Sequence, residues 1–316
     1  MLTREFYEGH QVRPGRLEAA IFRLAQPIRR LVGTRVDSEG IEGMPAEPVL
    51  LATNASHRHD FLLMRQVLLS RGVGSVVFSK PKNYHGLLGI LVRQLGTIPL
   101  VSRGYLILSD FVSRWRRRPT EEEYRILRDH LDQGVGVPDR EPFTSLMVTP
   151  REILGNRFVP SQEPWRECLR RLYREALARS LSLAREALQA GYHLHIYPQG
   201  TVAADAAPGR IGAVQIAWAL GLPLVPAGLN GARDIFLGDS PAFFGGHGVV
   251  RFGRPYHLAQ DLLPAEFVPF DPQHEERYRP RLQEATDELM RRIGSLLDES
   301  ARGPEPGPSR GTRAFL

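Results

Sequence analysis

From about residue 48 onward, the chain alternates short apolar runs with longer segments of helical periodicity. This alternation is typical of α/β proteins, in which helices cover a buried sheet. The predicted strands are 48–53, 74–80, 97–103, 193–198, 222–229 and 249–256. The predicted helices are 61–70, 85–96, 163–190, 211–221 and 281–300. We therefore expect an α/β fold.

Two segments do not follow this alternation. Residues 104–162 hold clusters of like charge and a loop rich in glycine and proline, which we interpret as an inserted subdomain. Residues 301–316 are rich in proline and glycine and are expected to be a disordered tail.

The N-terminal segment, residues 1–36, has the period of an amphipathic helix. Apolar residues recur at steps of three and four, namely Leu17, Ile21, Leu24, Ile28 and Leu31. The segment carries seven arginines and three glutamates, a net charge of +4. Such a helix can lie in an anionic membrane surface, or it can pack its stripe on the protein's own core. It shows neither a secretory signal nor an apolar stretch long enough to span a bilayer.

Arginine dominates the charge of the chain. The formal net charge is +6, and all but two of the 41 basic residues are arginine. This surplus favours anionic partners, such as lipid headgroups, phosphorylated substrates or nucleic acid. Cys168 is the single cysteine, which excludes an internal disulfide and fits a reducing compartment. The sequence holds no P-loop, no dinucleotide-binding glycine motif and no recognisable nucleic-acid-binding motif.

The first cluster of residues suited to catalysis follows the strand predicted at 48–53. It contains Ser56, His57 and Asp60. On a helical turn, residues three apart share a face, so the carboxylate of Asp60 could orient the His57 imidazole as a general base. The alternative is that Ser56 or Asp60 caps the next helix and the histidines are solvated.

Two further candidates also follow predicted strands. The segment 197–201 leads into a Gly-Thr pair whose backbone N–H groups could hold an anion, although an ordinary turn is the alternative. Arg103 ends the strand predicted at 97–103 and is suited either to a phosphate or to a surface ion pair. His193 and His195 share one side of a strand, and we interpret them as core or pocket histidines, so no metal site is expected.

In order along the chain, these motifs resemble those of the glycerolipid acyltransferase family, which includes the 1-acylglycerol-3-phosphate acyltransferases. SHRHDFLL at 56–63 resembles the first motif, with two residues between the His and the Asp where the family has four. The segment 80–103, which contains Gly-Thr-Ile-Pro and ends in Arg, is similar to the second motif. Tyr-Pro-Gln-Gly-Thr-Val at 197–202 resembles the third, Phe-Pro-Glu-Gly-Thr-Arg. The resemblance covers roughly residues 45–103 and 185–300.

The resemblance implies a single acyltransferase domain over residues 37–300, with a central mixed sheet flanked by helices and an insertion at about 104–162. It also implies transfer of an acyl group from acyl-CoA or acyl carrier protein to a hydroxyl of a lysophospholipid or related lipid acceptor. No cofactor is implied besides the acyl thioester. The expected location is the cytoplasmic face of a membrane, as a peripheral protein on an anionic lipid surface, with no nucleic-acid partner.

The resemblance also assigns roles to residues. His57 would be the general base and Asp60 would orient it. The substrate-binding residues would be Arg103, for an acceptor phosphate, together with Gln199, Gly200, Thr201 and, if its loop folds back, Arg210. The alternative is a catalytically inactive relative that binds lipid.

Overall fold

The computed structural model describes residues 4–12, 20, 23, 24, 27, 29–200, 208–236, 240 and 242–299. The tail predicted at 301–316 lies outside the described residues. So do Leu17, Ile21 and Ile28 of the predicted N-terminal stripe.

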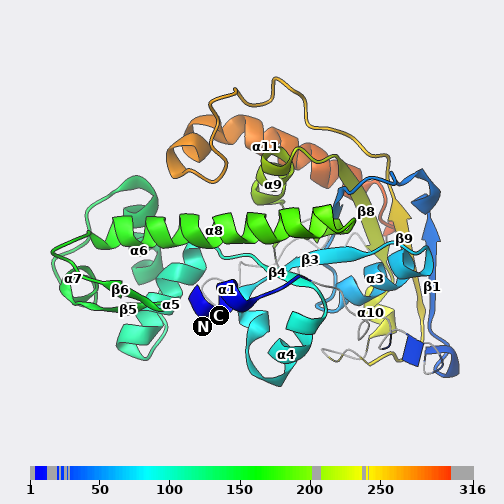
Figure 1. Ribbon diagram of the computed structural model, residues 1–316, viewed down its shortest axis with the longest axis horizontal. Helices are drawn as coiled ribbons and strands as arrows, with labels where there is room; N and C mark the ends of the chain where they lie inside the picture. Colours follow the sequence, from blue (N-terminus) through cyan, green and yellow to red (C-terminus); the bar gives the residue numbers. More distant parts are fainter. Residues whose placement is uncertain are drawn as a thin grey trace.

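A seven-stranded sheet lies at the centre, with the strand order β1-β9-β8-β2-β7-β3-β4 (Figure 1). Its strands are β1 (Arg35–Glu39), β2 (Leu50–Thr53), β3 (Ser75–Ser79), β4 (Thr97–Pro99), β7 (His193–Ile196), β8 (Leu224–Asn230) and β9 (His247–Phe252). Neighbouring strands are parallel except β8 and β9, which are antiparallel. The prediction of an α/β fold with a central mixed sheet flanked by helices is confirmed. β1, at the edge, was not among the predicted strands.

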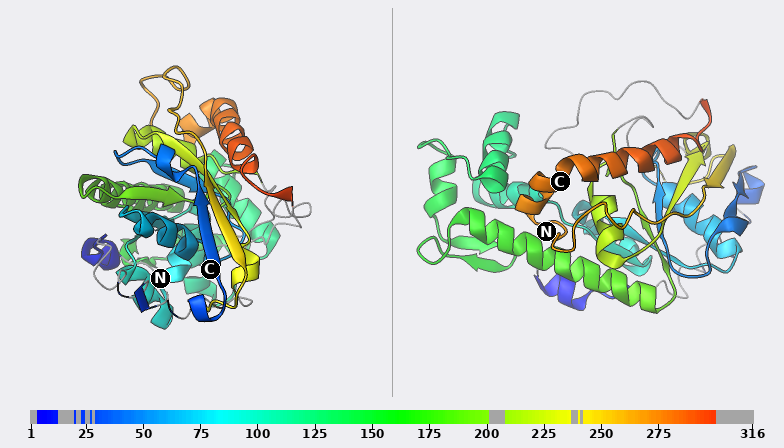
Figure 2. Two further views of the ribbon diagram at one scale, coloured as in Figure 1. Left: turned by 90° about the vertical axis from the view of Figure 1, so that its right-hand side faces the viewer. Right: turned by 90° about the horizontal axis from the view of Figure 1, so that it is seen from above.

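Helices connect the strands and cover both faces of the sheet. The α-helices are α1 (Arg4–Gly9), α3 (Asp60–Ser70), α4 (Gly86–Gln94), α5 (Arg103–Trp115), α6 (Glu121–Gln133), α7 (Phe143–Val148), α8 (Trp165–Gln189), α9 (Gly212–Leu220), α10 (Ala232–Ile235) and α11 (Pro272–Gly294). Within the described residues, η1 (Ile41–Gly43) and η2 (Pro81–Tyr84) are short 3-10 helices. Figure 2 shows α8 and α11 running along the length of the molecule, with α9 between them.

The central strand β2 is apolar on both sides because both faces of the sheet are covered. Leu50 and Ala52 belong to one hydrophobic cluster, whereas Val49 and Leu51 belong to a second cluster. Successive side chains of a strand point to opposite faces, so the two clusters lie on opposite sides of the sheet. All four residues of β2 are buried, as expected for a strand in the middle of a largely parallel sheet.

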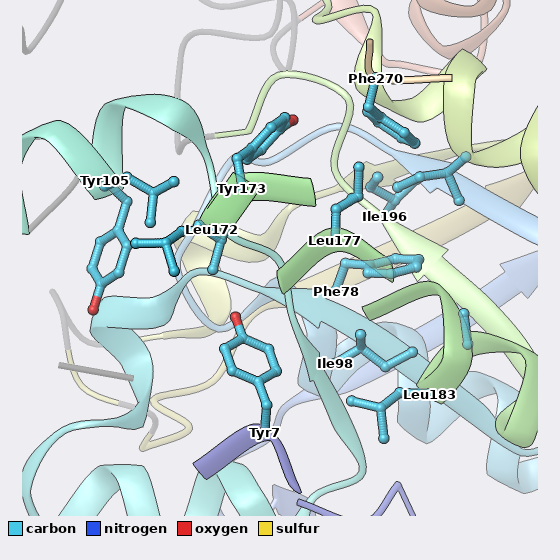
Figure 3. Close-up of a cluster of buried hydrophobic side chains, with 14 of the residues drawn as sticks. Tyr7, Phe78, Ile98, Tyr105, Leu172, Tyr173, Leu177, Leu183, Ile196 and Phe270 are labelled. Atoms are coloured by element: carbon cyan, nitrogen blue, oxygen red, sulfur yellow. The ribbon is translucent and has the colours of Figure 1, made fainter. Parts of the chain in front are cut away.

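The larger cluster joins the sheet to α8. Figure 3 shows Leu177 and Leu183 of this helix beside Phe78, Ile98 and Ile196 of the strands. The buried positions of α8 recur at helical spacing, which gives the helix one apolar face for the sheet. On the opposite side of the sheet, α3 contributes its own buried apolar residues to the second cluster.

Residues 104–162 form α5, α6, α7 and a hairpin of β5 (Arg151–Ile153) and β6 (Asn156–Phe158), at the end of the molecule opposite β1 (Figure 1). Asp110 of α5 holds these parts together. Its carboxylate accepts hydrogen bonds from Arg151 Nε at 2.7 Å, Arg151 Nη2 at 2.5 Å and Trp165 Nε1 at 2.7 Å. Because the Asp110 side chain is fully buried, this bidentate pair and the indole replace the water that the carboxylate loses.

The N-terminal segment contacts the core at its start. Tyr7 of α1 is buried in the larger cluster, and His10 Nε2 lies 2.6 Å from the carbonyl oxygen of Thr97. Leu24 and Leu31, which belong to the predicted stripe, are 71% and 87% exposed. At these two positions the stripe does not pack on the protein's own core. No helix within the described ranges is long and apolar enough to cross a membrane.

Two of the boundaries that differ from the predictions have a clear local cause. β4 ends at Pro99, and Arg103 is the first residue of α5 rather than the end of a strand, because Ser102 caps this helix by accepting a hydrogen bond from the N–H of Tyr105 at 3.2 Å. The last helix begins at Pro272, before the predicted 281, because Asp271 caps it and the proline takes an allowed first-turn position.

The Asp110 contacts generate a stability prediction. Asp110→Ala leaves the Arg151 guanidinium and the Trp165 N–H without their buried acceptor, so the free energy of unfolding should fall by about 3 kcal/mol or more. Glu122→Ala is the matched control, because Glu122 lies 3.6 Å from Arg140 in an exposed ion pair and its loss should change stability by less than about 1 kcal/mol. Urea denaturation measures both, and equal effects would contradict this account of the 104–162 segment.

Candidate active site

Two of the predicted clusters come together at one edge of the sheet. β2 and β7 are parallel neighbours, with Ala52 opposite Ile196, so the loops that follow them leave the sheet side by side. Gln199 is buried in the second loop, and its Oε1 accepts a hydrogen bond from the N–H of Ala55 at 2.9 Å. In an open α/β sheet, loops at the carboxyl ends of the strands are the usual place for a ligand site.

The Asp60 carboxylate closes the turn between β2 and α3. Its Oδ2 accepts hydrogen bonds from the backbone N–H of His57 at 2.7 Å and from the Ser56 hydroxyl at 3.2 Å. Asp60 is fully buried in the first turn of α3, where the helix dipole favours a negative charge. These contacts fix the backbone at His57, ahead of α3, whose N-cap residue is His59.

The His57 ring is held by a different group. Its Nδ1 accepts a hydrogen bond from the backbone N–H of His59 at 3.2 Å. A ring nitrogen that accepts a hydrogen bond carries no proton, so neutral His57 has its proton on Nε2 in this geometry. The predicted general base needs the opposite tautomer, with Nδ1–H directed at a carboxylate and Nε2 available to take a proton.

An aromatic side chain that sequence reasoning missed packs on His57. The ring of Phe236 stacks on the imidazole, with 4.9 Å between centroids and 12° between planes, and Phe243 stacks on Phe236 at 5.7 Å. Phe236 follows α10 and lies almost 180 positions along the chain from His57. No motif marks it, so only the folded structure reveals it.

A buried polar layer lies beneath the turn. The pKa of Tyr197 is raised well above its usual value by burial and by the charge of Asp60, while Arg65 opposes that rise. Burial and the charge of Arg65 lower the pKa of His195 to about 3. His195 Nε2 lies 2.7 Å from Thr53 Oγ1. His195 is therefore a neutral core residue.

Arg65 supplies the cation of this layer. Its guanidinium donates to the carbonyl oxygens of Leu95, of Gly96 at 2.7 Å and of Ser75 at 3.2 Å. It thereby ties α3 to the end of α4. Among the residues whose placement is described, no group of three or more His, Cys, Asp or Glu side chains could hold a metal ion.

The two described ends of the loop after β7 lie close together. The N–H of Arg210 donates to the carbonyl oxygen of Pro198 at 2.9 Å. Gly200 has φ +68°, and a Cβ at that position would lie 3.2 Å from Cδ of Arg210. Gly200 is therefore needed both for its backbone conformation and for the close approach of the arginine. Thr201 lies outside the described residues.

Arg103 lies at a separate place, at the start of α5. Its guanidinium pairs with Glu275 of α11 at 2.5 Å and with Asp132 of α6 at 3.1 Å, and its side chain is 11% exposed. Burial opposes the charge of Arg103, but the two carboxylates outweigh it and raise the pKa of the arginine. In this structure Arg103 ties three helices together, and a substrate phosphate would have to compete with both carboxylates.

A cavity of about 160 Å³ lies beside Arg103, lined also by Arg170, Tyr173 and Asp271. Pockets for drug-sized ligands measure about 300–1,000 Å³, so this cavity is too small to hold a long acyl chain.

Comparison with known proteins finds a likeness among solved structures. No family model matches this chain, and no curated protein sequence matches it. Among solved structures, the chain is similar to the crystal structure of the 1-acyl-sn-glycerophosphate (LPA) acyltransferase PlsC from Thermotoga maritima. The identity is 13% and the TM-score is 0.40, over 86% of this chain and 78% of that one. Any chemistry assigned to this chain must therefore come from its own residues.

The buried histidine generates a pH prediction. His195 has a pKa of about 3 in the folded protein against 6.5 when unperturbed, so between these values the unfolded chain binds the additional proton. The stability that neutral His195 contributes is complete above pH 6.5 and is lost as the pH falls, by up to about 1.4 kcal/mol per pH unit. Burial also lowers the pKa of His10 and His193, which adds to the same slope.

The measurement is urea denaturation of the parent and of His195→Gln between pH 5 and pH 7. The slope of the free energy of unfolding against pH should be smaller in His195→Gln by about 1 kcal/mol per pH unit. The exposed His257 provides the matched control, His257→Gln, which should keep the parent slope. A His195→Gln slope equal to that of the parent would contradict a buried, neutral His195.

Proposed function

We propose that this protein transfers an acyl group from a thioester, acyl-CoA or acyl carrier protein, to a hydroxyl of a lipid acceptor such as a lysophospholipid. The observation that carries this proposal is the junction of the loops after β2 and β7. At this junction the Gln199–Ala55 hydrogen bond holds the turn of His57 and Asp60 beside Gly200, which in turn contacts Arg210.

In this reaction the acceptor oxygen attacks the thioester carbonyl carbon, the acceptor loses its proton, and the thiol leaves as the C–S bond breaks. His57 is the proposed base for that proton. To act at Nε2, it must move its own proton to Nδ1, and the hydrogen bond from the His59 N–H then gives way. Asp60 is the nearby carboxylate, since its Oδ2 lies 2.7 Å from the backbone nitrogen of His57. We propose that it then accepts a hydrogen bond from Nδ1–H. No cofactor is proposed besides the thioester.

Arg210 is the proposed contact for a phosphate on the acceptor. Its side chain is exposed and lies against Gly200, so its charge is accessible to an anion at this loop. Arg103 is a weaker candidate for this role because Glu275 and Asp132 already hold its guanidinium.

The proposed location is the cytoplasmic face of a membrane, with the protein bound peripherally. The basic N-terminal segment supports this location, because Leu24 and Leu31 of its apolar stripe are exposed rather than packed on the core.

A second candidate function is that of a catalytically inactive protein that binds lipid. The hydrogen bond from the His59 N–H to His57 Nδ1 favours it, because that bond stabilises the tautomer that cannot act as a base at Nε2. In this case Asp60 serves only to close the turn.

Thiol release distinguishes the two candidates. The purified protein is incubated with a long-chain acyl-CoA, or acyl carrier protein thioester, and a panel of lysophospholipid, glycerol and amino-lipid acceptors. For an enzyme, release should depend on one class of acceptor, and His57→Ala should reduce it by about 100-fold or more. His59→Ala is the matched control, because it keeps the backbone N–H that contacts His57. Release that is absent with every donor and acceptor, from folded protein that binds vesicles, would overturn the enzyme and support the inactive relative.

The role of Arg210 has its own test. Arg210→Gln should raise KM for a phosphorylated acceptor by roughly tenfold and leave a neutral acceptor nearly unchanged, because one charge-assisted phosphate contact is lost. Arg118→Gln, at an exposed position of the 104–162 segment, is the control for lost positive charge. A change that is equal for both acceptors would exclude Arg210 as the phosphate contact.

A further inference from the structure

The ring of Phe236 is an aromatic face on which the His57 imidazole lies. The two rings stack with 4.9 Å between centroids and 12° between planes. A nearly parallel stack fixes the plane of a ring, but it does not select which ring nitrogen carries the proton, because both tautomers present the same two faces. The contact with Phe236 is therefore compatible with either tautomer of His57.

The hydrogen bond at the edge of the His57 ring, in contrast, suits one tautomer. The N–H of His59 donates to His57 Nδ1 at 3.2 Å, which requires an Nδ1 without a proton. The proposed base needs its proton on Nδ1, so this hydrogen bond breaks when the base is formed. The stack on Phe236 survives that change and keeps the plane of the imidazole.

Phe236 is itself held in a fixed position. Its side chain is buried, and Phe243 also stacks on it, with 5.7 Å between centroids and 25° between planes. The backbone joins the same two residues in an antiparallel bridge. Beside this bridge, the N–H of Phe244 donates to the carbonyl oxygen of Ile235 at 2.8 Å. The ring of Phe236 is thus fixed through both its side chain and its backbone.

The helix that precedes Phe236, α10, lies tightly against the sheet. Ala232 and Ile235 of this helix are buried in the second hydrophobic cluster, to which Phe236 also belongs. Gly231, directly before α10, has φ +74°, and a Cβ there would collide with the carbonyl oxygen of His247 at the start of β9. The sheet therefore leaves Phe236 little freedom to move away from His57.

The face of Phe236 also suits the charge that the proposed reaction creates. When His57 takes the proton of the acceptor, the imidazole becomes a cation. An aromatic face attracts a cation that lies within about 6 Å of the ring centroid, and the two centroids are 4.9 Å apart. This attraction is stronger for the charged imidazole than for the neutral one, so it favours the state formed in the reaction over the resting state.

We propose that Phe236 is a positioning residue for the base. It keeps the plane of the His57 ring while the tautomer changes, and it stabilises the imidazolium that forms. This role rests on the proposed function, since it acts through His57 as the base. It also brings into the reaction a residue that lies outside all of the motifs in the sequence. The alternative is that Phe236 only fills the core beside α10.

Kinetics of thiol release test this role, with the donor and acceptor that the parent uses. In Phe236→Leu, kcat should fall by about tenfold, because the base loses its aromatic face, while KM for the acceptor should stay within about twofold. Phe236→Tyr keeps an aromatic face and should keep kcat within about twofold of the parent. Phe252→Leu is the matched control, because Phe252 is a buried phenylalanine of the same hydrophobic cluster, on β9, and its loss should leave kcat within about twofold.

A spectroscopic readout accompanies the kinetics. The ring current of Phe236 shifts the NMR signals of the carbon-bound protons on the His57 ring that lies over its face. This shift should be lost in Phe236→Leu and kept in Phe252→Leu. Circular dichroism establishes that each variant is folded. Should Phe236→Leu not fold, Phe236→Met takes its place, because a flexible methionine side chain can fill the space of the ring.

Equal losses of kcat in Phe236→Leu and Phe252→Leu would overturn the positioning role, and so would a loss that appears in KM alone. A folded Phe236→Tyr variant as slow as Phe236→Leu would overturn it too. A parent that releases no thiol with any donor or acceptor would overturn the proposed function and the positioning role together. An active parent whose kcat does not respond to Phe236→Leu would overturn the positioning role alone, so the two failures give different results.

Discussion

The parallel placement of β2 between β7 and β8 is the constraint on which the rest of this structure depends. It requires apolar residues on both faces of β2, which in turn requires helices on both faces of the sheet. It also brings the loops after β2 and β7 to one edge, where Gln199 accepts a buried hydrogen bond from the N–H of Ala55. The candidate active site is a consequence of this strand order, since its residues lie about 140 positions apart in the chain.

The second organising feature is the Asp60 carboxylate. A buried carboxylate must be compensated, and here the His57 N–H, the Ser56 hydroxyl and the start of α3 compensate it. The short spacing between His57 and Asp60 explains this arrangement, because two intervening residues form a tight turn in which the carboxylate reaches the backbone. The imidazole is then held by the His59 N–H and by the face of Phe236.

The sequence was sufficient for much of the sheet. Strand β2 was predicted at 48–53 and lies at 50–53, and β7 was predicted at 193–198 and lies at 193–196, because short apolar runs bounded by turns are strong signals. The approach of the Gln199 loop to the His57 turn was implied only through the resemblance to a family. Contacts in the same turn, such as Asp60 with His57, could be listed in advance as alternatives but not decided, since the choice depends on hydrogen-bond geometry.

Long-range partners could not be predicted in this way. Arg103 was expected either to bind a phosphate or to form an ion pair, but its partner Glu275, 172 positions away, could not be named because no local pattern identifies it. Phe236 was missed for the same reason. The edge strand β1 was missed because its sequence, RVDSE, has Val36 as its one apolar residue and is too short to show a period. Edge strands need less apolar sequence because one side of each is open.

The most direct test of this account is the tautomer of His57 in the ligand-free protein. Long-range ¹H–¹⁵N spectra of protein labelled at histidine, with the His57 signals assigned by their loss in His57→Gln, report which ring nitrogen carries the proton. The account predicts the Nε2–H form at neutral pH, with Nδ1 accepting the hydrogen bond from the His59 N–H. A His57 ring protonated at Nδ1 would contradict it and would mean that Asp60 orients the imidazole directly.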